Sequence, residues 1–243
     1  MKHLIVILLV IGILSCKDRE PRIVAIETDN LSSEQLDSIL TEFKFKYESP
    51  IIFDSTNQVL IPISTELLDK RTKFSSDGYY SNNYPRYWNV LFYNRQTGKT
   101  QLLTENKIRI SQIHTNSYEK RDGGVEEYKI LYEITDIDFN KDKKLNNKDP
   151  QYLFSSSIDG NNLKRVSPIN ESLQDFRVVS GTKQILIRTL RDTNKDSLFN
   201  REDESIWYNA ELRNENWKIE EMIDSIERRM IGRLYLDQWL KKK

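Results

Sequence analysis

Three segments of the chain share one order of elements: a strand, a polar loop, a second strand, a tight turn and a third strand. Apolar residues recur in these segments with the period of strands rather than that of helices. The predicted strands span 58–64, 87–94 and 99–104 in the first unit, 128–134, 151–157 and 163–168 in the second, and 183–190, 205–212 and 217–222 in the third. Short strands joined by tight turns predict a mainly β fold with antiparallel sheets.

The second unit reads YLFSSSIDGNNLKRVSP over 152–168, so that an apolar strand, an Asp-Gly turn and a further strand follow one another. This stretch resembles one repeat of the TolB-like β-propellers. The resemblance covers roughly residues 50 to 222 and implies three propeller-blade-like units. The segments 109–115 and 175–181 are expected to supply a fourth strand to two of these units. Propellers have four or more blades, so we expect a partial or atypical β-propeller, with a β-sandwich as the alternative.

One helix is expected before the strand-rich part of the sequence and one after it. Ser32 and Gln35 fit a capping box, and apolar residues at helical spacing follow them, which predicts a short N-terminal helix. The segment 223–243 has apolar residues near helical spacing and ends in three lysines, which suit a helix C-terminus. We expect a C-terminal helix that packs on the sheet, with a last strand as the alternative.

The first residues of the chain predict a secretory signal. An apolar run from Leu4 to Leu14 is far shorter than the roughly 20 residues that span a bilayer. It leads to Cys16, the only cysteine of the chain. The stretch ILSC that ends there resembles the lipobox of bacterial lipoproteins, in which the cysteine becomes the first mature residue and carries acyl chains such as palmitate. An ordinary cleavage site followed by a free thiol is the alternative.

The lipobox resemblance implies a place in the cell. We expect a signal peptide over 1–15, a lipid-anchored tether over 16–24 and one β-propeller-like domain over 25–243. The charged residues 17–20 resemble the tag that sends lipoproteins of Gram-negative bacteria to the outer face of the outer membrane. The membrane is therefore the first expected partner, reached through acylated Cys16.

One loop pattern occurs twice, each time between two predicted strands. DFNKDKKLNNKD spans 138–149 and DTNKDSLFNRED spans 192–203. In both copies, oxygen-bearing side chains stand at positions 1, 3, 5, 9 and 12. Calcium binds six to eight oxygens, and such a loop can surround it while position 7 offers a backbone carbonyl. The pattern predicts two calcium sites, with ligands Asp138, Asn140, Asp142, Lys144, Asn146 and Asp149 in one loop and Asp192, Asn194, Asp196, Leu198, Asn200 and Asp203 in the other.

These loops resemble the EF-hand-type loops of dockerins and the calcium loops of integrin-like propellers. They depart from that pattern at position 6, where the sharp turn calls for glycine and the chain has Lys143 and Ser197. Two other registers are open, in which Asp136 is the first ligand or Glu202 or Glu204 replaces Asp203. A polar hairpin without metal is the alternative, because Asp and Asn are ordinary turn residues. The segments after both loops predict strands, so the loops are expected to connect hairpins.

Composition gives little support to enzymatic chemistry. Once the signal peptide is removed, His114 is the only histidine, so Ser/His and Cys/His nucleophilic arrangements and the usual zinc sites are not expected. His114 itself is expected to be a surface residue or a satisfied strand residue. The formal net charge is zero, which gives no reason to expect a nucleic-acid partner. The enzymatic alternative is a carbohydrate-active enzyme on a propeller-like scaffold that uses paired carboxylates.

The stretch DGYYSNNYPRYW, at 77–88, is rich in aromatic residues. Exposed aromatics beside Asn and Arg suit contacts with sugars or proteins, whereas buried ones would cover the end of the sheet. The candidate surface consists of Tyr79, Tyr80, Tyr84, Tyr87 and Trp88. We expect a lipid-anchored, extracytoplasmic, calcium-binding β-repeat protein that is a binding or structural module, with a protein or polysaccharide partner, rather than an enzyme.

Overall fold

The structure is a computed structural model that describes residues 32–34, 37, 45–53, 56–65, 87–115, 129–143 and 145–240. The chain divides into two compact units, Met1–Phe43 and Lys44–Lys243. In the first unit Ser33, Glu34 and Asp37 are helical, within the predicted N-terminal helix. The signal peptide, Cys16, the tether and the rest of that helix lie outside the described residues. No helix among the described residues is long and apolar enough to cross a membrane.

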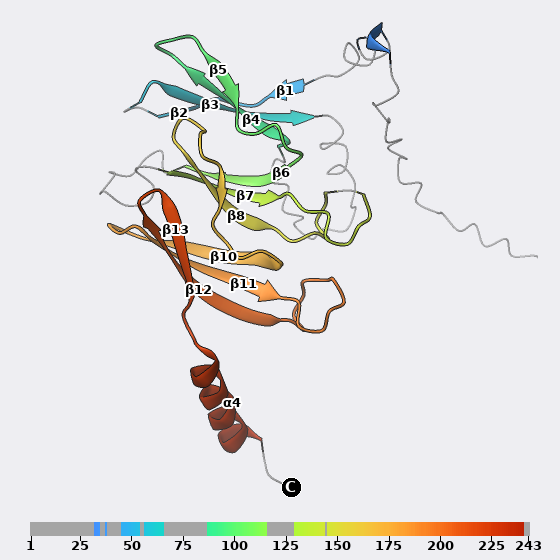
Figure 1. The fold of residues 1–243 in the computed structure, drawn as a ribbon, viewed down its shortest axis with the longest axis vertical. Helices are drawn as coiled ribbons and strands as arrows, with labels where there is room; N and C mark the ends of the chain where they lie inside the picture. The colour runs from blue at the N-terminus through green and yellow to red at the C-terminus, as the bar shows by residue number, and fades with distance from the viewer. Residues whose placement is uncertain are drawn as a thin grey trace, which may run out of the picture. The chain divides into compact units, whose positions relative to one another are not determined.

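The compact unit Lys44–Lys243 contains three antiparallel sheets (Figure 1). The first sheet is made of β1 (Phe45–Tyr47), β2 (Ile51–Ile52), β3 (Gln58–Thr65), β4 (Asn89–Asn94) and β5 (Thr100–Leu102). The second sheet is made of β6 (Arg109–His114), β7 (Lys129–Thr135), β8 (Tyr152–Ser157) and β9 (Lys164–Arg165). The third sheet is made of β10 (Glu171–Val179), β11 (Gln184–Arg191), β12 (Glu204–Arg213) and β13 (Asn216–Glu221).

The predicted mainly β fold is confirmed, and the predicted strands of each repeat form in the predicted order. The polar loop expected in the first repeat lies outside the described residues. In the second and third sheets the four strands lie side by side in chain order. As expected, β6 and β10 supply the fourth strand of these two sheets. In the first sheet β3 lies between β1 and β4, and the short strand β2 also pairs with β3.

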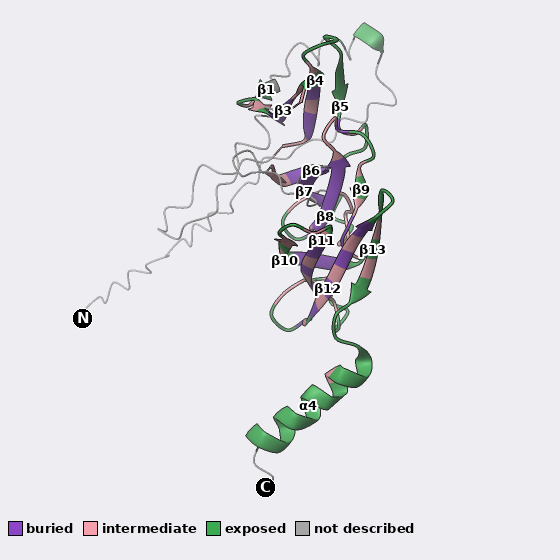
Figure 2. Cartoon of the chain, turned by 90° about the vertical axis from the view of Figure 1, so that its left-hand side faces the viewer, coloured by how far each residue is buried: buried purple, intermediate pink, exposed green. Residues whose placement is uncertain are grey.

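The second sheet is buried on both faces because it lies between two hydrophobic cores (Figure 2). Along β7, Ile130 and Tyr132 belong to the core shared with the first sheet, while Leu131 belongs to the core shared with the third. Successive side chains of a strand point to opposite faces, so one strand can serve both cores. This position explains why nearly every residue of β7 and β8 is buried, Ser155 and Ser156 of β8 included, whereas buried and half-buried residues alternate along β11.

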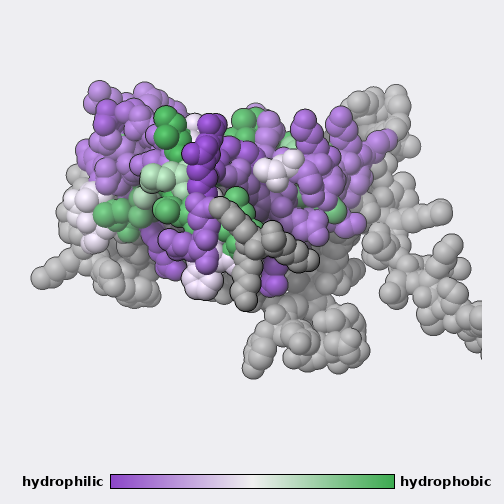
Figure 3. Space-filling view, turned by 90° about the horizontal axis from the view of Figure 1, so that it is seen from below, coloured by the Kyte–Doolittle hydropathy of each residue, from purple (hydrophilic) through white to green (hydrophobic). Residues whose placement is uncertain are grey.

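The C-terminal helix forms, but the expectation that it packs on the sheet is wrong. Helix α4 (Ser225–Trp239) begins with a capping box, in which the side chain of Asp224 accepts hydrogen bonds from the backbone N–H groups of Ile226 and Glu227. None of its residues is buried, and Ile226 and Trp239 are 76% and 72% exposed. The face seen from below in Figure 3 carries hydrophobic and hydrophilic residues side by side. Apolar residues at helical spacing therefore predicted the helix correctly but not its partner.

The turn of the third sheet forms without the Asp-Gly sequence of the second. Asn214 and Glu215, between β12 and β13, have φ of 45° and 65°. Positive φ at both central residues is the geometry of a type I′ hairpin turn, which matches the twist of the flanking strands. Lys129 of β7 forms an ion pair with Glu215, and this pairing lowers the pKa of the Glu215 carboxyl. The turn is thereby joined to the second sheet.

Candidate functional site

The two repeated loops take equivalent places in the fold. The loop at 138–149 joins β7 to β8, and the loop at 192–203 joins β11 to β12, so both are hairpin connections as predicted. Their backbones also agree at the two positions where a side chain is most restricted. Position 4 has φ of 59° in Lys141 and 62° in Lys195, and position 6 has φ of 65° in Lys143 and 62° in Ser197. The sharp turn expected at position 6 is therefore present in both loops without glycine.

Replacing Ser197 with glycine is expected to raise the free energy of unfolding by about 0.5 to 1 kcal/mol. Glycine adopts a positive φ without the Cβ clash that serine meets, and its greater freedom in the unfolded chain offsets part of that gain. Urea denaturation followed by circular dichroism measures the change. Ser205→Gly in β12 is the control, because glycine in a strand is expected to destabilise by roughly 1 kcal/mol. An equal loss in both variants would contradict the left-handed conformation at position 6.

The side chains at positions 1 and 3 make the same turns in both loops. At position 1, Asp138 accepts the backbone N–H of position 6 at 2.7 Å, and Asp192 does so at 3.1 Å. At position 3, Asn140 and Asn194 accept the N–H of position 5 at 2.9 and 3.0 Å. The oxygens of positions 1 and 3 therefore lie on the inside of the same tight turn.

The aspartates at position 12 tie the two ends of each loop together. The carboxylate of Asp149 accepts the backbone N–H groups of positions 2 and 9 at 3.0 and 2.8 Å. Asp203 repeats this arrangement at 3.1 and 2.9 Å. Both aspartates are buried, with exposures of 6% and 9%. The sequence predicted a metal ligand at position 12, whereas the geometry gives these carboxylates a second, purely structural task that pattern matching missed.

If a cation binds, the oxygens left for it besides position 12 are those of positions 1, 3, 5 and 9, with the position-7 carbonyl of Leu198 in the second loop. One oxygen of Asp192, Oδ1, is buried and has no hydrogen-bond partner among the described residues, and the same holds for Oδ1 of Asp136. A ligand atom that faces a cation would be left in this state. Within the described ranges, no three His, Cys, Asp or Glu side chains converge as a metal cluster. A calcium ion would therefore depend on asparagine and carbonyl oxygens as well as carboxylates, which suits a hard cation. Leu198 at position 7 is described, whereas Lys144 lies outside the described residues.

The residues of the two other registers have different partners. Asp136 forms an ion pair with Arg165 at 2.6 Å, and Glu204 forms one with Arg228 at 2.9 Å. Glu202 is exposed. The ion pair of Glu204 and the exposure of Glu202 favour Asp203 at position 12 of the second loop. Asp136 keeps one buried oxygen, Oδ1, without a partner among the described residues, so Asp136 and Asp138 both remain candidates for the first ligand of the first loop.

The two loops contact each other through aromatic rings. Phe139, at position 2 of the first loop, lies 5.2 Å from Phe199, at position 8 of the second, measured between ring centroids. The rings are tilted by 54°, within the range of favourable aromatic pairs. An ion in one loop would thus stiffen a surface on which the other loop rests.

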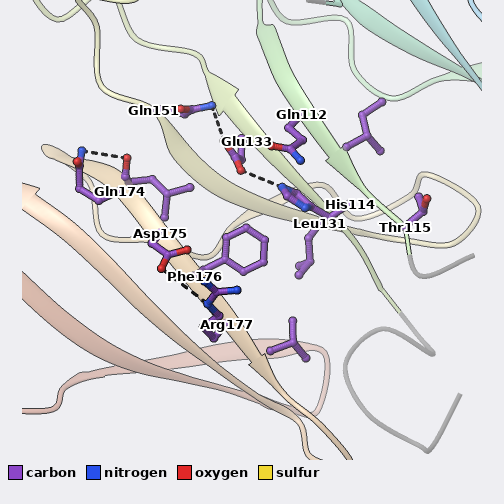
Figure 4. Close-up of a pocket in the computed structure, with 13 residues that line it drawn as sticks. Gln112, His114, Thr115, Leu131, Glu133, Gln151, Gln174, Asp175, Phe176 and Arg177 are labelled. Carbon is purple, nitrogen blue, oxygen red and sulfur yellow. Dashed lines mark hydrogen bonds and ion pairs between the residues drawn. The ribbon is translucent and has the colours of Figure 1, made fainter. Parts of the chain in front are cut away.

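A polar groove between the second and third sheets runs beside the loops. It consists of two adjoining cavities of about 680 and 610 Å³. Five residues line both cavities, namely Gln112, Glu133, Gln151, Leu173 and Gln174. Residues of both repeated loops line the first cavity, among them Asn146 and Asn200. Strands β6 and β10 line most of the second cavity (Figure 4).

Glu133 organises the side chains at the centre of the groove. One of its oxygens lies 2.9 Å from His114 Nε2, and the other accepts a hydrogen bond from Gln151 Nε2 at 3.0 Å (Figure 4). The ring of Phe176, on β10, meets the His114 ring edge to face at 4.8 Å. His114 is therefore a satisfied strand residue, as predicted, but it also lies in a groove that the sequence did not indicate. Its partners come from separate strands, so no local pattern marks them.

Two members of the predicted aromatic surface are described, and both help to join strands. The backbone N–H of Tyr87 donates to Ile110 O at 2.9 Å, and that of Trp88 donates to Ile63 O at 3.0 Å. Both side chains are half-buried, and burial raises the pKa of the Tyr87 hydroxyl. Tyr79, Tyr80 and Tyr84 lie outside the described residues.

The chain has also been compared with known proteins. Neither the family models nor the curated proteins searched gave a match to this chain.

Proposed function

We propose that the chain is a lipid-anchored, extracytoplasmic protein that binds calcium in two loops and acts as a binding or structural module. The observation that carries the calcium assignment is the agreement of the loops at 138–149 and 192–203. Both loops connect two antiparallel strands, have positive φ at positions 4 and 6, and make the same hydrogen bonds through the side chains at positions 1, 3 and 12. A polar turn without a ligand has no need to repeat every one of these features.

The rest of the proposal rests on the sequence and on the order of the strands. The lipobox-like stretch ending at Cys16 and the charged residues after it support an acylated protein of the Gram-negative outer membrane, exposed on its outer face. The chain order of strands in the second and third sheets supports propeller-blade-like units, and three such units would make a partial or atypical propeller. The polar groove supports a binding role for a protein or polysaccharide partner, and the zero net charge gives no support to nucleic acid.

Calcium titration tests the proposal. Calorimetry on the chain from Lys17 onward is expected to show two sites, with dissociation constants on the order of 10⁻⁴ to 10⁻³ M. At about ten times the dissociation constant, each occupied site should add about 1.4 kcal/mol to the free energy of unfolding. Asp142→Ala and Asp196→Ala should each remove one site, because each takes away a position-5 carboxylate.

Asp237→Ala, on exposed helix α4, is the matched control and should leave both sites intact. Melting curves in calcium and in chelator give an independent readout. No heat of binding, together with equal melting temperatures in calcium and chelator, would show that the repeated loop is a polar hairpin and nothing more.

The second candidate function is a carbohydrate-active enzyme. Two carboxylates outside both loops, Glu133 and Asp175, line the cavity between β6 and β10, as such an enzyme would require. Asp175 lies 3.8 Å from the guanidinium of Arg177, and Glu133 is held by His114 and Gln151. Release of reducing ends from a neutral polysaccharide, lost in both Glu133→Gln and Asp175→Asn, would favour this candidate over a binding module.

A further inference from the structure

We propose that the groove between the second and third sheets binds an extended, uncharged oligosaccharide. The inference rests on the proposed binding role and names its ligand class. The groove is formed by residues that lie far apart in the sequence, and its two cavities share five lining residues and so lie next to each other. A ligand longer than a single sugar unit fits a groove of this extent better than a compact metabolite does.

The lining of the groove is rich in side-chain amides. Six of its residues are glutamine or asparagine, namely Gln112, Asn146, Asn147, Gln151, Gln174 and Asn200. An amide offers both donors and an acceptor, and a sugar hydroxyl also offers both, so the two groups complement each other. Carboxylate and imidazole groups beside the amides, from Glu133 and His114, add further hydrogen-bonding positions.

Two of these amides can make further hydrogen bonds. The Gln112 side chain makes no hydrogen bond within the described part of the chain, and it is half-buried on β6. Gln174 donates only to the neighbouring backbone oxygen of Leu173, at 3.2 Å, among the contacts described for it. A ligand that supplies hydroxyl groups would complete the hydrogen bonding of both side chains.

The charges of the groove argue for an uncharged ligand. Glu133 contacts His114, Asp175 lies beside Arg177, and buried Asp149 accepts two backbone N–H groups. The guanidinium of Arg109, itself 7% exposed, donates to Asn147 Oδ1. Apart from Lys148, the charged groups described in the lining thus contact protein atoms, and the described lining holds no cluster of one sign that would attract a phosphate or a polyanion.

Aromatic rings complete the recognition of a sugar. Phe176 and Phe199 line the two cavities, one in each. A pyranose has hydroxyl groups at its rim and an apolar C–H face, and the apolar face packs against such rings. Phe199 also contacts Phe139 of the other repeated loop, so the ordering of both loops should affect the cavity beside them.

Affinity electrophoresis tests the inference on the full-length chain, purified in a sugar-free nonionic detergent with calcium present. The probes are a mixed-linkage β-glucan, a xylan, a galactomannan and soluble starch, with polygalacturonate as the anionic comparison. At least one neutral polysaccharide should slow the migration of the chain. The double variant Gln112→Ala and Gln174→Ala should weaken this retardation about tenfold, since it removes two hydrogen-bonding side chains.

Gln238→Ala, an amide removal on exposed helix α4, is the matched control and should leave retardation unchanged. The inference is overturned if no neutral polysaccharide retards the chain, if polygalacturonate binds best, or if the double variant is retarded like the unmodified chain. Calcium titration of the same samples separates the two proposals. Two calcium sites without polysaccharide binding would remove only the ligand assignment, whereas retardation without calcium binding would remove only the metal assignment.

Discussion

Replacement of Glu171 with alanine is expected to lower the free energy of unfolding by about 2 to 4 kcal/mol. Glu171, on β10, is 5% exposed and accepts hydrogen bonds from Arg191 Nε and Thr189 Oγ1, both at 2.6 Å. The hydroxyl of Tyr208 also donates to it, at 2.9 Å. Alanine would leave three donors without their acceptor. Urea denaturation followed by tryptophan fluorescence measures the loss.

The surroundings of Arg191 limit the expected loss of free energy. The guanidinium of Arg191 is 35% exposed and has a second carboxylate partner, Glu221 at 2.7 Å, so water and Glu221 soften the loss. Hydrogen bonding to Arg191 also lowers the pKa of Glu221, while burial and the bond to Glu171 raise the pKa of Tyr208.

Glu220→Ala is the control for charge removal alone. Its ion pair with Lys218 lies at the surface, with exposures of 61% and 47%, and should be worth at most about 0.5 kcal/mol. A similar loss in Glu220→Ala and Glu171→Ala would mean that the Glu171 network does not stabilise the third sheet.

Gly160→Ala is expected to destabilise the protein by about 2 to 4 kcal/mol. Gly160, in the turn between β8 and β9, has φ of +84°, and a Cβ there would lie 2.5 Å from the Phe92 ring. Phe92 is 1% exposed in the core between the first and second sheets, so its ring has little room to move. The substitution therefore combines backbone strain with overpacking.

Gly98→Ala separates these two causes. Gly98 has a similar φ of +69°, but an added Cβ would have no atom within 4 Å. Its alanine variant should lose only about 1 kcal/mol, from backbone strain. Thermal melts of both variants measure the difference. Equal losses would show that the Phe92 ring does not press on the turn.

The strands and loops were predictable because their signals are local. The period of two residues marked most of the strands, and the repeated Asp and Asn residues marked both hairpin loops. In β7 the three consecutive apolar residues 130–132 fit a strand with both faces buried, which has no need for alternation. The structural role of Asp149 was not predictable, because its spacing suggested only a metal ligand and its burial and its bond to the Phe139 N–H appear only in the structure.

The groove and the Glu171 network were not predictable because they depend on register between distant strands. His114 and Glu133 meet because β6 and β7 pair with a register shift, and Phe176 joins them from another sheet. The predicted packing of helix α4 on the sheet was wrong because it was inferred from local spacing alone. The apolar residues of α4 were read as a core face, yet spacing along a helix does not state what, if anything, covers it.

The middle sheet's place between two cores affects how a chain of this kind can change in length. Each sheet comes from one continuous stretch, and each core forms between sheets that are neighbours in the sequence. Duplicating a gene segment as long as the interval from Asp138 to Asp192 would add one sheet at an end of the series. The added sheet would need only one face that packs against the neighbouring sheet, as in repeat proteins. Such chains can therefore gain or lose sheets over evolution without rethreading the sheets that are already in place.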